Sequence, residues 1–355
     1  MAPLVKELKA RPEIETIVCV TAQHRQMLDQ VLQAFHIVPD YDLDIMKQGQ
    51  TLSDITTRVL QGLESVIKEV RPDIVLVHGD TTTTFAGALA AFYQQVAIGH
   101  VEAGLRTCNK YSPYPEEMNR QMVGVLCDLH FAPTEQSRQN LLAEGKREET
   151  IFVTGNTAID ALQTTVRDDY HSELLDWAKD SRLIVLTAHR RENLGQPMYQ
   201  MFRAIRRIIE KYSDVKMVYP VHLNPVVVQA ADDVFGDCDK IRLVPPMEVV
   251  DFHNLLGRSH LILTDSGGIQ EEAPSLGKPV VVLRDTTERP EGIAAGTLKL
   301  AGTDEENIYA IVDQLLSDDQ EYEKMSHASN PYGDGLASKR IADAIIHCFL
   351  KTLLI

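Results

Sequence analysis

Short apolar runs of strand length alternate with helical segments along most of this chain of 355 residues. Such alternation is typical of a parallel sheet that has helices on both of its faces. A first series of predicted strands covers residues 16–20, 74–77, 97–101, 129–132 and 151–154. A second series covers residues 183–186, 217–219, 241–244, 261–264 and 280–283. Because the strand pattern lapses near residues 168–179, the sequence predicts an α/β protein with two Rossmann-like domains.

The expected domain limits follow from these two series. Residues 1–168 are predicted to form the first domain and residues 169–336 the second, while residues 337–355 form a helix that packs back on the first domain. The chain is longer than one usual core requires, which agrees with two domains. Ligands of open α/β sheets bind at the carboxyl ends of the strands, so we expect the site in a cleft across which the domains face each other.

The composition restricts the partners and the compartment. The chain has 35 basic and 51 acidic residues, and its net charge of −16 argues against general binding of nucleic acid or anionic membranes. No window approaches the length of a membrane span, and no signal peptide is evident. The five cysteines are scattered without a CxxC pair, which predicts reduced thiols and a cytoplasmic protein.

A glycine turn after the predicted strand 261–264 has the pattern of an anion site. Asp265 and Ser266 can cap a helix at this position. Gly267 and Gly268 let backbone N–H groups approach a ligand closely, and a helix N-terminus attracts phosphate. An ordinary capped helix is the alternative interpretation.

Two further positions favour a nucleotide over a simple helix cap. Glu272 lies about one helical turn beyond Gly268, where its carboxylate can accept hydrogen bonds from ribose hydroxyls. Arg284 and Arg289, which follow the next strand, can add positive charge beside a diphosphate. A solvated charged loop remains the alternative for the two arginines.

Carboxylates follow the strands of the first series. Asp80 comes after the strand 74–77, and Glu102 comes directly after the strand 97–101. Glu116 and Glu117 lie in the first turn of a predicted helix. Helix capping and complementation of the helix dipole can account for each of them separately. Several carboxylates on one rim repel one another and create acid/base pairs, so together they predict proton transfer.

Histidines and arginines follow two strands of the second series. His189 and Arg190 come after the strand 183–186, and His222 comes after the strand 217–219. A surface basic cluster is the alternative for the first pair, and a satisfied histidine near the core is the alternative for His222. No spacing resembles a metal site, and neither a GxSxG elbow nor a Walker lysine is present, so metal and acyl-transfer chemistry are not expected.

Several of these motifs together resemble one enzyme family over essentially the whole chain. The matching runs are VHGDTTTT, GHVEAGLRT, YSPYPEEMNR, TAHRREN, YPVHLNP, LTDSGGIQEEAPSLGKPV, RDTTERPEG and NPYGDG. In this order they are similar to the non-hydrolysing UDP-N-acetylglucosamine 2-epimerases. The resemblance implies a glycosyltransferase-B-like fold, a cytoplasmic homodimer, UDP-GlcNAc and UDP as ligands, and neither a cofactor nor a metal.

The resemblance also implies an activity and residue roles. UDP-GlcNAc and UDP-ManNAc are interconverted through a 2-acetamidoglucal, which supplies ManNAc units for cell-envelope polysaccharide. The implied catalytic residues are Asp80, Glu102, Glu116 and His189. The implied UDP-binding residues are Phe252, Ser266, Gly267, Gly268, Glu272 and Arg289. A hydrolysing epimerase, a glycosyltransferase of the same fold and a non-catalytic nucleotide-sugar sensor are the alternatives.

A regulatory site is implied as well. In bacterial members activated by their own substrate, a second UDP-GlcNAc lies near the positions that match Gln23, Gln26, Arg190 and His222. The basic residue expected at the position of Gly49 is absent, which predicts weakened substrate activation.

The family resemblance carries one expectation about the start of the chain. Family members have a strand and a Gly-Thr-Arg-Pro-Glu turn before the segment that matches residues 1–4, and the turn contributes an arginine to the substrate cleft. The expectation is therefore a shortened form with low stability and little turnover.

Overall fold

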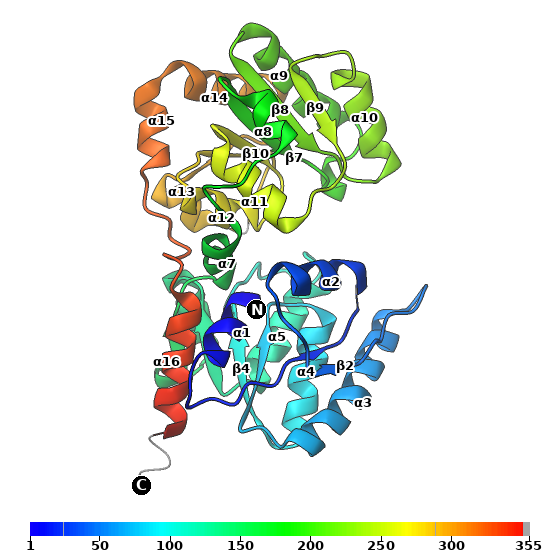
Figure 1. Ribbon diagram of the computed structural model, residues 1–355. Helices are drawn as coiled ribbons and strands as arrows, with labels where there is room; N and C mark the ends of the chain where they lie inside the picture. The colour runs from blue at the N-terminus through cyan, green and yellow to red at the C-terminus, as the bar shows by residue number, and fades with distance from the viewer. Residues whose placement is uncertain (24, 288, 351–355) are drawn as a thin grey trace. The chain divides into compact units, whose positions relative to one another are not determined.

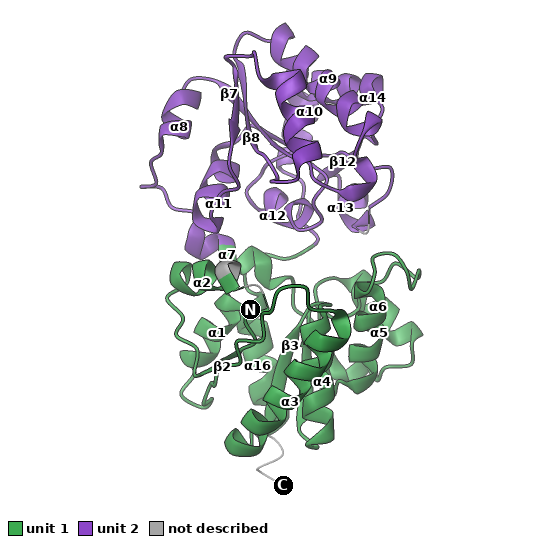
Figure 2. Ribbon diagram, turned by 90° about the vertical axis from the view of Figure 1, so that its right-hand side faces the viewer, with its two compact units in different colours: residues 1–161, 332–355 green, residues 162–331 purple. Residues whose placement is uncertain are grey.

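The computed structural model describes residues 1–23, 25–287 and 289–350, apart from the side chains of residues 26, 27 and 350. The chain divides into two compact units, which Figure 2 shows in different colours. Unit 1 comprises Met1–Ala161 together with Tyr332–Ile355, and unit 2 comprises Leu162–Pro331. Within the described residues, no helix is long and apolar enough to cross a membrane.

Unit 1 contains two separate parallel sheets (Figure 1). The smaller sheet consists of β1 (Cys19–Val20) and β2 (Tyr41–Asp42). The larger sheet has the order β3-β4-β5-β6, which is also the order of these strands in the chain. Its strands are Ile74–His78, Ala97–Val101, Leu129–Ala132 and Ile151–Val153.

The strand that the sequence predicts at residues 16–20 is shorter in the structure. Only Cys19–Val20 form β1, and the backbone oxygens of Val18 and Val20 accept N–H groups of the β2 segment at 3.1 and 2.9 Å. A strand gains its ladder from its neighbours, and β1 pairs with β2 alone among the described residues. The prediction of the full strand 16–20 was therefore wrong in length.

Helices cover both faces of the larger sheet in unit 1. Leu4 of α1 and Ile341 of α16 pack with Phe131 of β5 on one face. Ala88 of α4 and Val123 of α5 pack with Ile98 of β4 on the other face. The helices of unit 1 are α1 (Ala2–Lys9), α2 (Arg25–Ala34), α3 (Leu52–Val70), α4 (Thr82–Tyr93), α5 (Glu116–Leu126), α6 (Glu135–Ala143) and α16 (Ala337–Leu350).

A buried carboxylate ties the returning C-terminal segment to unit 1. Asp160 lies in α7 (Thr157–Thr165) and accepts the backbone N–H groups of Ala337 and Ser338 at 3.1 and 2.6 Å. These N–H groups begin α16 and have no intrahelical partner, so a carboxylate stabilises them and also complements the helix dipole.

Unit 2 has one six-stranded parallel sheet in the order β12-β11-β10-β7-β8-β9. Its strands in chain order are β7 (Arg182–Thr187), β8 (Val215–Pro220), β9 (Ile241–Val244), β10 (Leu261–Thr264), β11 (Val280–Val282) and β12 (Leu298–Leu300). The chain moves outward from β7 to β9, then returns to place β10 on the other side of β7. This reversal is a topological switch point, where open α/β sheets bind their ligands.

Helices also cover both faces of the sheet in unit 2. Phe202 of α9 and Phe235 of α10 pack on one face, and Leu256 of α11 and Ala273 of α12 pack on the other. The helices of unit 2 are α8 (Glu173–Ala178), α9 (Gln196–Lys211), α10 (Pro225–Phe235), α11 (Val249–Arg258), α12 (Ile269–Ser275), α13 (Pro290–Ala295), α14 (Glu305–Ser317) and α15 (Asp319–Ser326).

Candidate active site

Asp80 lies at the carboxyl end of β3 and is held by an arginine of α5. Its Oδ2 accepts hydrogen bonds from Nε and Nη2 of Arg120 at 3.0 and 2.7 Å. Asn119 also donates from its side chain to the backbone oxygen of Asp80 at 2.8 Å. The first turns of α5 therefore lie against the β3–α4 turn, and Asp80 is a fixed, ion-paired carboxylate.

The two glutamates that begin α5 have different environments. Glu117 is fully buried, and it accepts hydrogen bonds from Arg120 and from the backbone N–H groups of Thr107 and Cys108. Burial opposes ionisation of Glu117, but the backbone N–H of Thr107 and its other donors outweigh burial and lower its pKa. Glu117 therefore holds the loop before α5 in place, which is a structural role.

Glu116 has no such set of partners. Its Oε2 atom is buried and has no hydrogen-bond partner among the described residues. Glu116 and Arg120 are four residues apart in α5, so their side chains lie on the same helix face, which is the face that contacts Asp80. A buried carboxylate oxygen without a donor is uncommon in a folded protein, and it suits a group that exchanges a proton with a ligand.

Glu102 follows β4, the neighbour of β3, in a strained backbone conformation. Its φ angle is 66°, a value that non-glycine residues adopt rarely and mainly at functional sites. Its Oε2 lies 3.9 Å from Nε2 of His78, and Asn156 donates to its Oε1 at 3.4 Å. Gly79 has a φ of 71°, and a Cβ atom there would come within 3.1 Å of Oε2 of Glu102, so glycine leaves room for this carboxylate.

Two histidines of β3 and β4, His78 and His100, lie near these carboxylates and are neutral at physiological pH. Burial lowers the pKa of His78 well below its usual value, and the Met1 amino group contributes. Burial also lowers the pKa of His100 to about 4, despite its hydrogen bond to the backbone oxygen of Gly79 at 2.8 Å. These rings therefore add no positive charge beneath the carboxylates.

In unit 2, Asp265 organises the switch point between β7 and β10. It is fully buried, and its Oδ2 accepts the backbone N–H groups of His189 and Arg190 at 2.9 and 2.8 Å. The side-chain amide of Asn193 donates to the same oxygen at 3.2 Å. From the sequence, Asp265 is expected only to cap the following helix. Instead, the N-cap of α12 is Gly268, and Asp265 fixes the neighbouring loop.

The glycine turn places Ser266, Gly267 and Gly268 between β10 and α12. The N-cap of α12 is Gly268, and no side chain caps the N-terminal backbone N–H groups of this helix. Glu272 lies on the first turn of α12, and its Oε2 is 3.6 Å from Nε2 of the buried His253. This turn has the arrangement that the sequence predicts for an anion site.

The residues expected beside the nucleotide lie around this turn. Arg289 is buried, and its Nε donates to Oε1 of Glu271 at 2.7 Å. Arg289 thus has a buried carboxylate partner that the local sequence pattern does not predict. Phe252 lies in α11 and is packed against the core on the α12 side of the sheet. The assignment of both residues to UDP binding stays a prediction.

His189 and His222 lie close together, as their positions after neighbouring strands predict. Their rings stack with centroids 5.5 Å apart and an interplanar angle of 12°. Burial lowers the pKa of His189, and Asp265 opposes this shift. The N–H of Asn224 donates to Nδ1 of His222 at 3.1 Å.

The candidate regulatory residues belong to both units. Gln23 lies in unit 1, where its side-chain oxygen accepts a hydrogen bond from Thr83 at 2.7 Å. Gln26 is in α2 of the same unit, and its side chain lies outside the described residues. Arg190 and His222 lie in unit 2. Gly49 has a φ of 72° and open space around its Cβ position.

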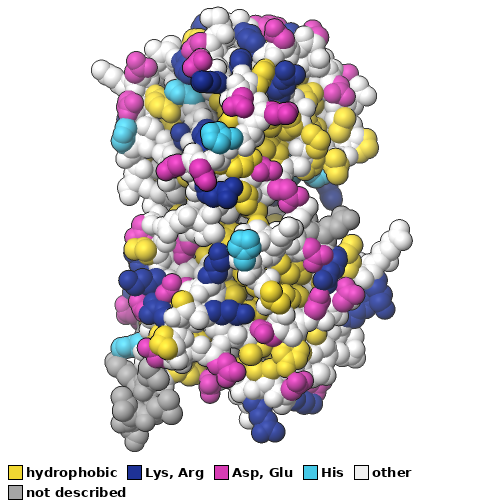
Figure 3. All heavy atoms as spheres, viewed as in Figure 1, with side chains coloured by type: hydrophobic (Ala, Val, Ile, Leu, Met, Phe, Trp, Pro, Cys, Tyr) yellow, Lys and Arg dark blue, Asp and Glu magenta, His cyan; other side chains and the backbone are white. Residues whose placement is uncertain are grey.

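On the face that Figure 3 shows, the charged side chains do not form one field of a single sign. Figure 3 shows acidic and basic side chains interspersed over the visible face of each unit. The net charge of −16 is therefore compatible with a local anion site such as the turn at Ser266.

Two parallel α/β units, with carboxylates at the strand ends of one and a glycine turn at the switch point of the other, are typical of enzymes that act on nucleotide sugars. The family model described as UDP-N-acetylglucosamine 2-epimerase matches residues 6–346. The chain belongs to the UDP-N-acetylglucosamine 2-epimerase family.

Individual relatives agree with this assignment. The chain is 68% identical over 346 residues to a UDP-N-acetylglucosamine 2-epimerase of Bacillus subtilis, covering 98% of this chain and 91% of the relative. A solved putative UDP-N-acetylglucosamine 2-epimerase from Listeria monocytogenes has a TM-score of 0.94 and 59% identity over 99% of this chain and 93% of that chain. The enzyme from Neisseria meningitidis, solved with bound UDP-GlcNAc, has a TM-score of 0.90 and 49% identity over 98% of this chain and 96% of that chain. The expected α/β fold of the glycosyltransferase-B-like class is confirmed.

Proposed function

We propose that this protein interconverts UDP-GlcNAc and UDP-ManNAc by inverting C2 of the sugar, without a cofactor or a metal. The observation that carries the proposal is the carboxylate rim of unit 1. Asp80 follows β3, Glu102 follows the adjacent strand β4, and Glu116 begins α5, the helix whose first turns contact Asp80. A protein that only bound an anionic nucleotide sugar would gain nothing from acids at this rim. The similarity to a relative solved with UDP-GlcNAc supports the choice of substrate.

The chemistry explains why carboxylates are needed. The C2 proton is not next to a carbonyl group, so a side-chain base cannot simply remove it. When the C1–O bond breaks, UDP leaves with the electron pair and C1 gains positive charge. A carboxylate can then take the C2 proton, which gives a 2-acetamidoglucal with a C1–C2 double bond. In the reverse step, a proton reaches the opposite face of C2 and a UDP oxygen bonds to C1, so every atom is recovered.

The environments of the three carboxylates suggest a division of roles. Inversion at C2 needs a proton carrier on each face of the sugar. Asp80 is fixed by two hydrogen bonds from Arg120, and a carboxylate fixed in this way suits a group that orients the sugar. Glu116 has a buried oxygen without a donor among the described residues, and Glu102 stands in a strained backbone conformation of the kind found at functional sites. On these grounds we assign proton transfer to Glu102 and Glu116.

Unit 2 holds the departing UDP in this proposal. The backbone of Ser266, Gly267 and Gly268 at the start of α12 suits the diphosphate, and Glu272 suits the ribose. Arg289 and Phe252 complete the nucleotide site, with Phe252 beside the uracil. His189 has a lowered pKa, so it is a neutral group near this turn.

One incubation separates the proposal from its alternatives. The protein is mixed with UDP-GlcNAc alone in D2O and followed by proton NMR. An epimerase forms UDP-ManNAc and places deuterium at C2 of both nucleotide sugars. Accumulation of free sugar and UDP would identify a hydrolase instead, whereas a glycosyltransferase without acceptor or a non-catalytic sensor would leave the C2 proton signal unchanged.

The proposal includes a cytoplasmic homodimer. Val125 of α5 is 74% exposed, and Phe92 and Tyr93 at the end of the neighbouring α4 are 54% and 60% exposed. Apolar side chains of this size at the ends of two packed helices are typical of a subunit contact. The scattered positions of the cysteines, without a CxxC pair in the sequence, support a reducing compartment.

Regulation by a second UDP-GlcNAc molecule is part of the proposal. We predict sigmoidal kinetics for the natural chain and half-saturation at a lower UDP-GlcNAc concentration after Gly49→Arg, because the new cation adds a charged contact for a diphosphate. The Cβ position has open space, although the φ of 72° adds local strain. Gly49→Ala, which carries the strain without the charge, is the control. Hyperbolic kinetics in all three proteins would show that no regulatory site operates.

A further inference from the structure

Two buried carboxylate oxygens have no hydrogen-bond partner among the described residues. They are Oε2 of Glu116 in unit 1 and Oδ1 of Asp265 in unit 2. A carboxylate oxygen that is buried without a donor costs free energy, so a partner is expected for each of them. For Glu116, the proposed proton exchange with the sugar supplies one. Oδ1 of Asp265 requires a partner of its own.

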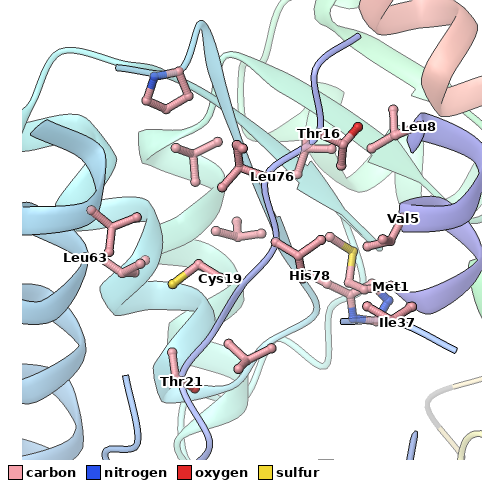
Figure 4. Close-up of a pocket in the computed structure, with 18 of the residues that line it drawn as sticks. Met1, Val5, Leu8, Thr16, Cys19, Thr21, Ile37, Leu63, Leu76 and His78 are labelled. Atoms are coloured by element: carbon pink, nitrogen blue, oxygen red, sulfur yellow. The ribbon is translucent and has the colours of Figure 1, made fainter. Parts of the chain in front are cut away.

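The surroundings of this oxygen differ from those of the cavity in unit 1. That cavity is lined mainly by apolar side chains, among them Cys19, Leu63 and Leu76 in Figure 4. Such a lining gives a polar ligand few hydrogen bonds. Asp265 instead lies among hydrogen-bonding groups at the switch point of unit 2, directly before the turn that begins at Ser266.

The other oxygen of Asp265 fixes the direction of the carboxylate. Oδ2 accepts the backbone N–H groups of His189 and Arg190 at 2.9 and 2.8 Å. It also accepts the side-chain amide of Asn193 at 3.2 Å. A carboxylate with three donors on one oxygen has little freedom to rotate, so Oδ1 keeps its position beside the ring of His189.

The imidazole of His189 is placed to supply the missing donor. Its Nδ1 lies 3.6 Å from Oδ1 of Asp265, somewhat beyond hydrogen-bond range. The side chain of His189 is 40% exposed, so the ring has room to turn, and stacking on His222 with an interplanar angle of 12° keeps its plane. A small rotation within that plane brings Nδ1 to the buried oxygen.

We propose that Asp265 is a positioning residue that acts on the ligand through His189. Oδ1 accepts the Nδ1–H group of the neutral imidazole, so Nε2 carries a lone pair and is directed away from Asp265. Nε2 therefore accepts a hydrogen bond from the ligand. It selects a donor such as a sugar hydroxyl and disfavours an unprotonated phosphate oxygen. This inference rests on the proposed binding of a nucleotide sugar.

The charges around the ring agree with a neutral imidazole. Burial lowers the pKa of His189, and the neighbouring His222 and Arg190 act in the same direction. Asp265 and Glu192 oppose the shift without reversing it. A neutral ring has one N–H group, and the buried oxygen of Asp265 decides which nitrogen carries it.

Nitrogen NMR of protein labelled with ¹⁵N-histidine tests the tautomer, because protonated and unprotonated ring nitrogens give separate signals. The signals of His189 are those missing from the spectrum of a His189→Gln variant. In the natural protein without ligand, at neutral to slightly alkaline pH, we expect Nδ1 to be protonated and Nε2 to be unprotonated.

Asp265→Asn should invert this tautomer. An amide has one acceptor oxygen, and this oxygen remains with the three N–H donors, more weakly because it carries no charge. The NH2 group then takes the place of Oδ1 and donates to Nδ1 of His189, so the ring proton moves to Nε2. Asn193→Ala is the matched control, because it removes a donor from Oδ2 and leaves Oδ1 unchanged. It should keep the Nδ1–H tautomer.

A double-variant cycle gives a second measurement. We expect Asp265→Asn to lower C2 deuterium exchange at low UDP-GlcNAc by about 10-fold, as for the loss of one hydrogen bond. Combined with His189→Gln, it should cause little further loss, because Asp265 acts through the ring.

The possible results lead to different conclusions. An Nε2–H tautomer in the natural protein would overturn the proposal, as would a tautomer that Asp265→Asn leaves unchanged. If that variant does not fold, the spectrum of the natural protein decides alone. Fully additive losses in the double variant would give Asp265 a role in the loop only. A natural protein with the Nδ1–H tautomer but without C2 exchange would instead disprove the proposed epimerase function and keep the placement of His189.

Discussion

At the scale of single residues, replacing each of the three rim carboxylates should lower the activity, but the effect on the stability of the protein should differ among them. We predict that Asp80→Asn, Glu102→Gln and Glu116→Gln each lower C2 deuterium exchange by about 10²- to 10⁴-fold and keep UDP binding, because each removes a charge used in proton transfer or sugar orientation. Asp80→Asn should also lower the melting temperature, because it leaves the 92%-buried Arg120 without one of its two carboxylates.

Glu116→Gln should leave the melting temperature unchanged or raise it, since its buried Oε2 has no protein donor to lose. Calorimetric titration with UDP and thermal unfolding of the same variants check these outcomes. Glu117→Gln is the control, because it is adjacent in sequence but serves the loop before α5. Near-normal deuterium exchange in all three rim variants would disprove the acid/base assignment.

Asp265 is a positioning residue at the same scale. We predict that Asp265→Asn lowers the free energy of unfolding by about 1–3 kcal/mol, since one oxygen now accepts three N–H donors and an amide group disturbs that set. UDP affinity should fall as well, because the loop after β7 lies beside the anion-binding turn. Urea unfolding and UDP titration measure the two effects. Asn193→Ala removes only one donor and should lose less stability; an equal or greater loss there would argue against this role.

Residue types and their places after strands could be predicted, but their partners could not. The positions of Asp80 and Ser266 at strand ends follow from local sequence patterns. The pairing of Asp80 with Arg120 joins residues 40 positions apart, and that of Arg289 with Glu271 joins residues 18 positions apart. Such contacts depend on tertiary packing, which a periodicity does not encode. The bridging role of Asp265 was missed for the same reason.

At the scale of elements, His100 links the stability of β4 to pH. Its ring is 99% buried and donates to Gly79, and its folded pKa is lowered from 6.5 to about 4. Between these pH values the unfolded chain binds a proton that the folded chain does not, so stability is lost as the pH falls from 6.5 to 4. We predict a loss of about 3 kcal/mol from this histidine over that window.

A His100→Gln variant isolates this contribution, because glutamine can donate to Gly79 but does not titrate. Its unfolding free energy should fall less between pH 7 and pH 4 than that of the natural chain, measured by urea unfolding in parallel. The carboxylates shared by both proteins cancel in the comparison. Identical pH profiles would mean that His100 becomes protonated without cost in the folded protein.

The limits of several strands were predicted correctly, both inside a sheet and at its edge. The strand 261–264 appears with the expected limits, and β10 lies between β7 and β11. The predicted strand 16–20 shrinks to Cys19–Val20, because only β2 pairs with it. Apolar sequence favours a strand, but the ladder that defines one depends on what lies beside it.

At the scale of the whole molecule, the order of strands in unit 2 could be anticipated only in part. Alternating strands and helices predict a parallel sheet, and the fold class is confirmed by solved relatives with a TM-score of 0.94. The return of the chain from β9 to β10 beside β7 has no local signal in the sequence. That return brings Asp265 next to the loop of His189, where Asp265 accepts the backbone N–H of His189.

The last prediction concerns assembly. Val125, Phe92 and Tyr93 form the apolar surface at the ends of α4 and α5 that we assign to a homodimer. We predict that Val125→Asp converts a dimer into a monomer in sedimentation velocity, because a buried, unpaired carboxylate in a subunit contact costs several kcal/mol. Val38→Asp is the matched control, since Val38 is also in unit 1 and is 78% exposed. A Val125→Asp protein that sediments as the natural chain does would place the subunit contact on another surface.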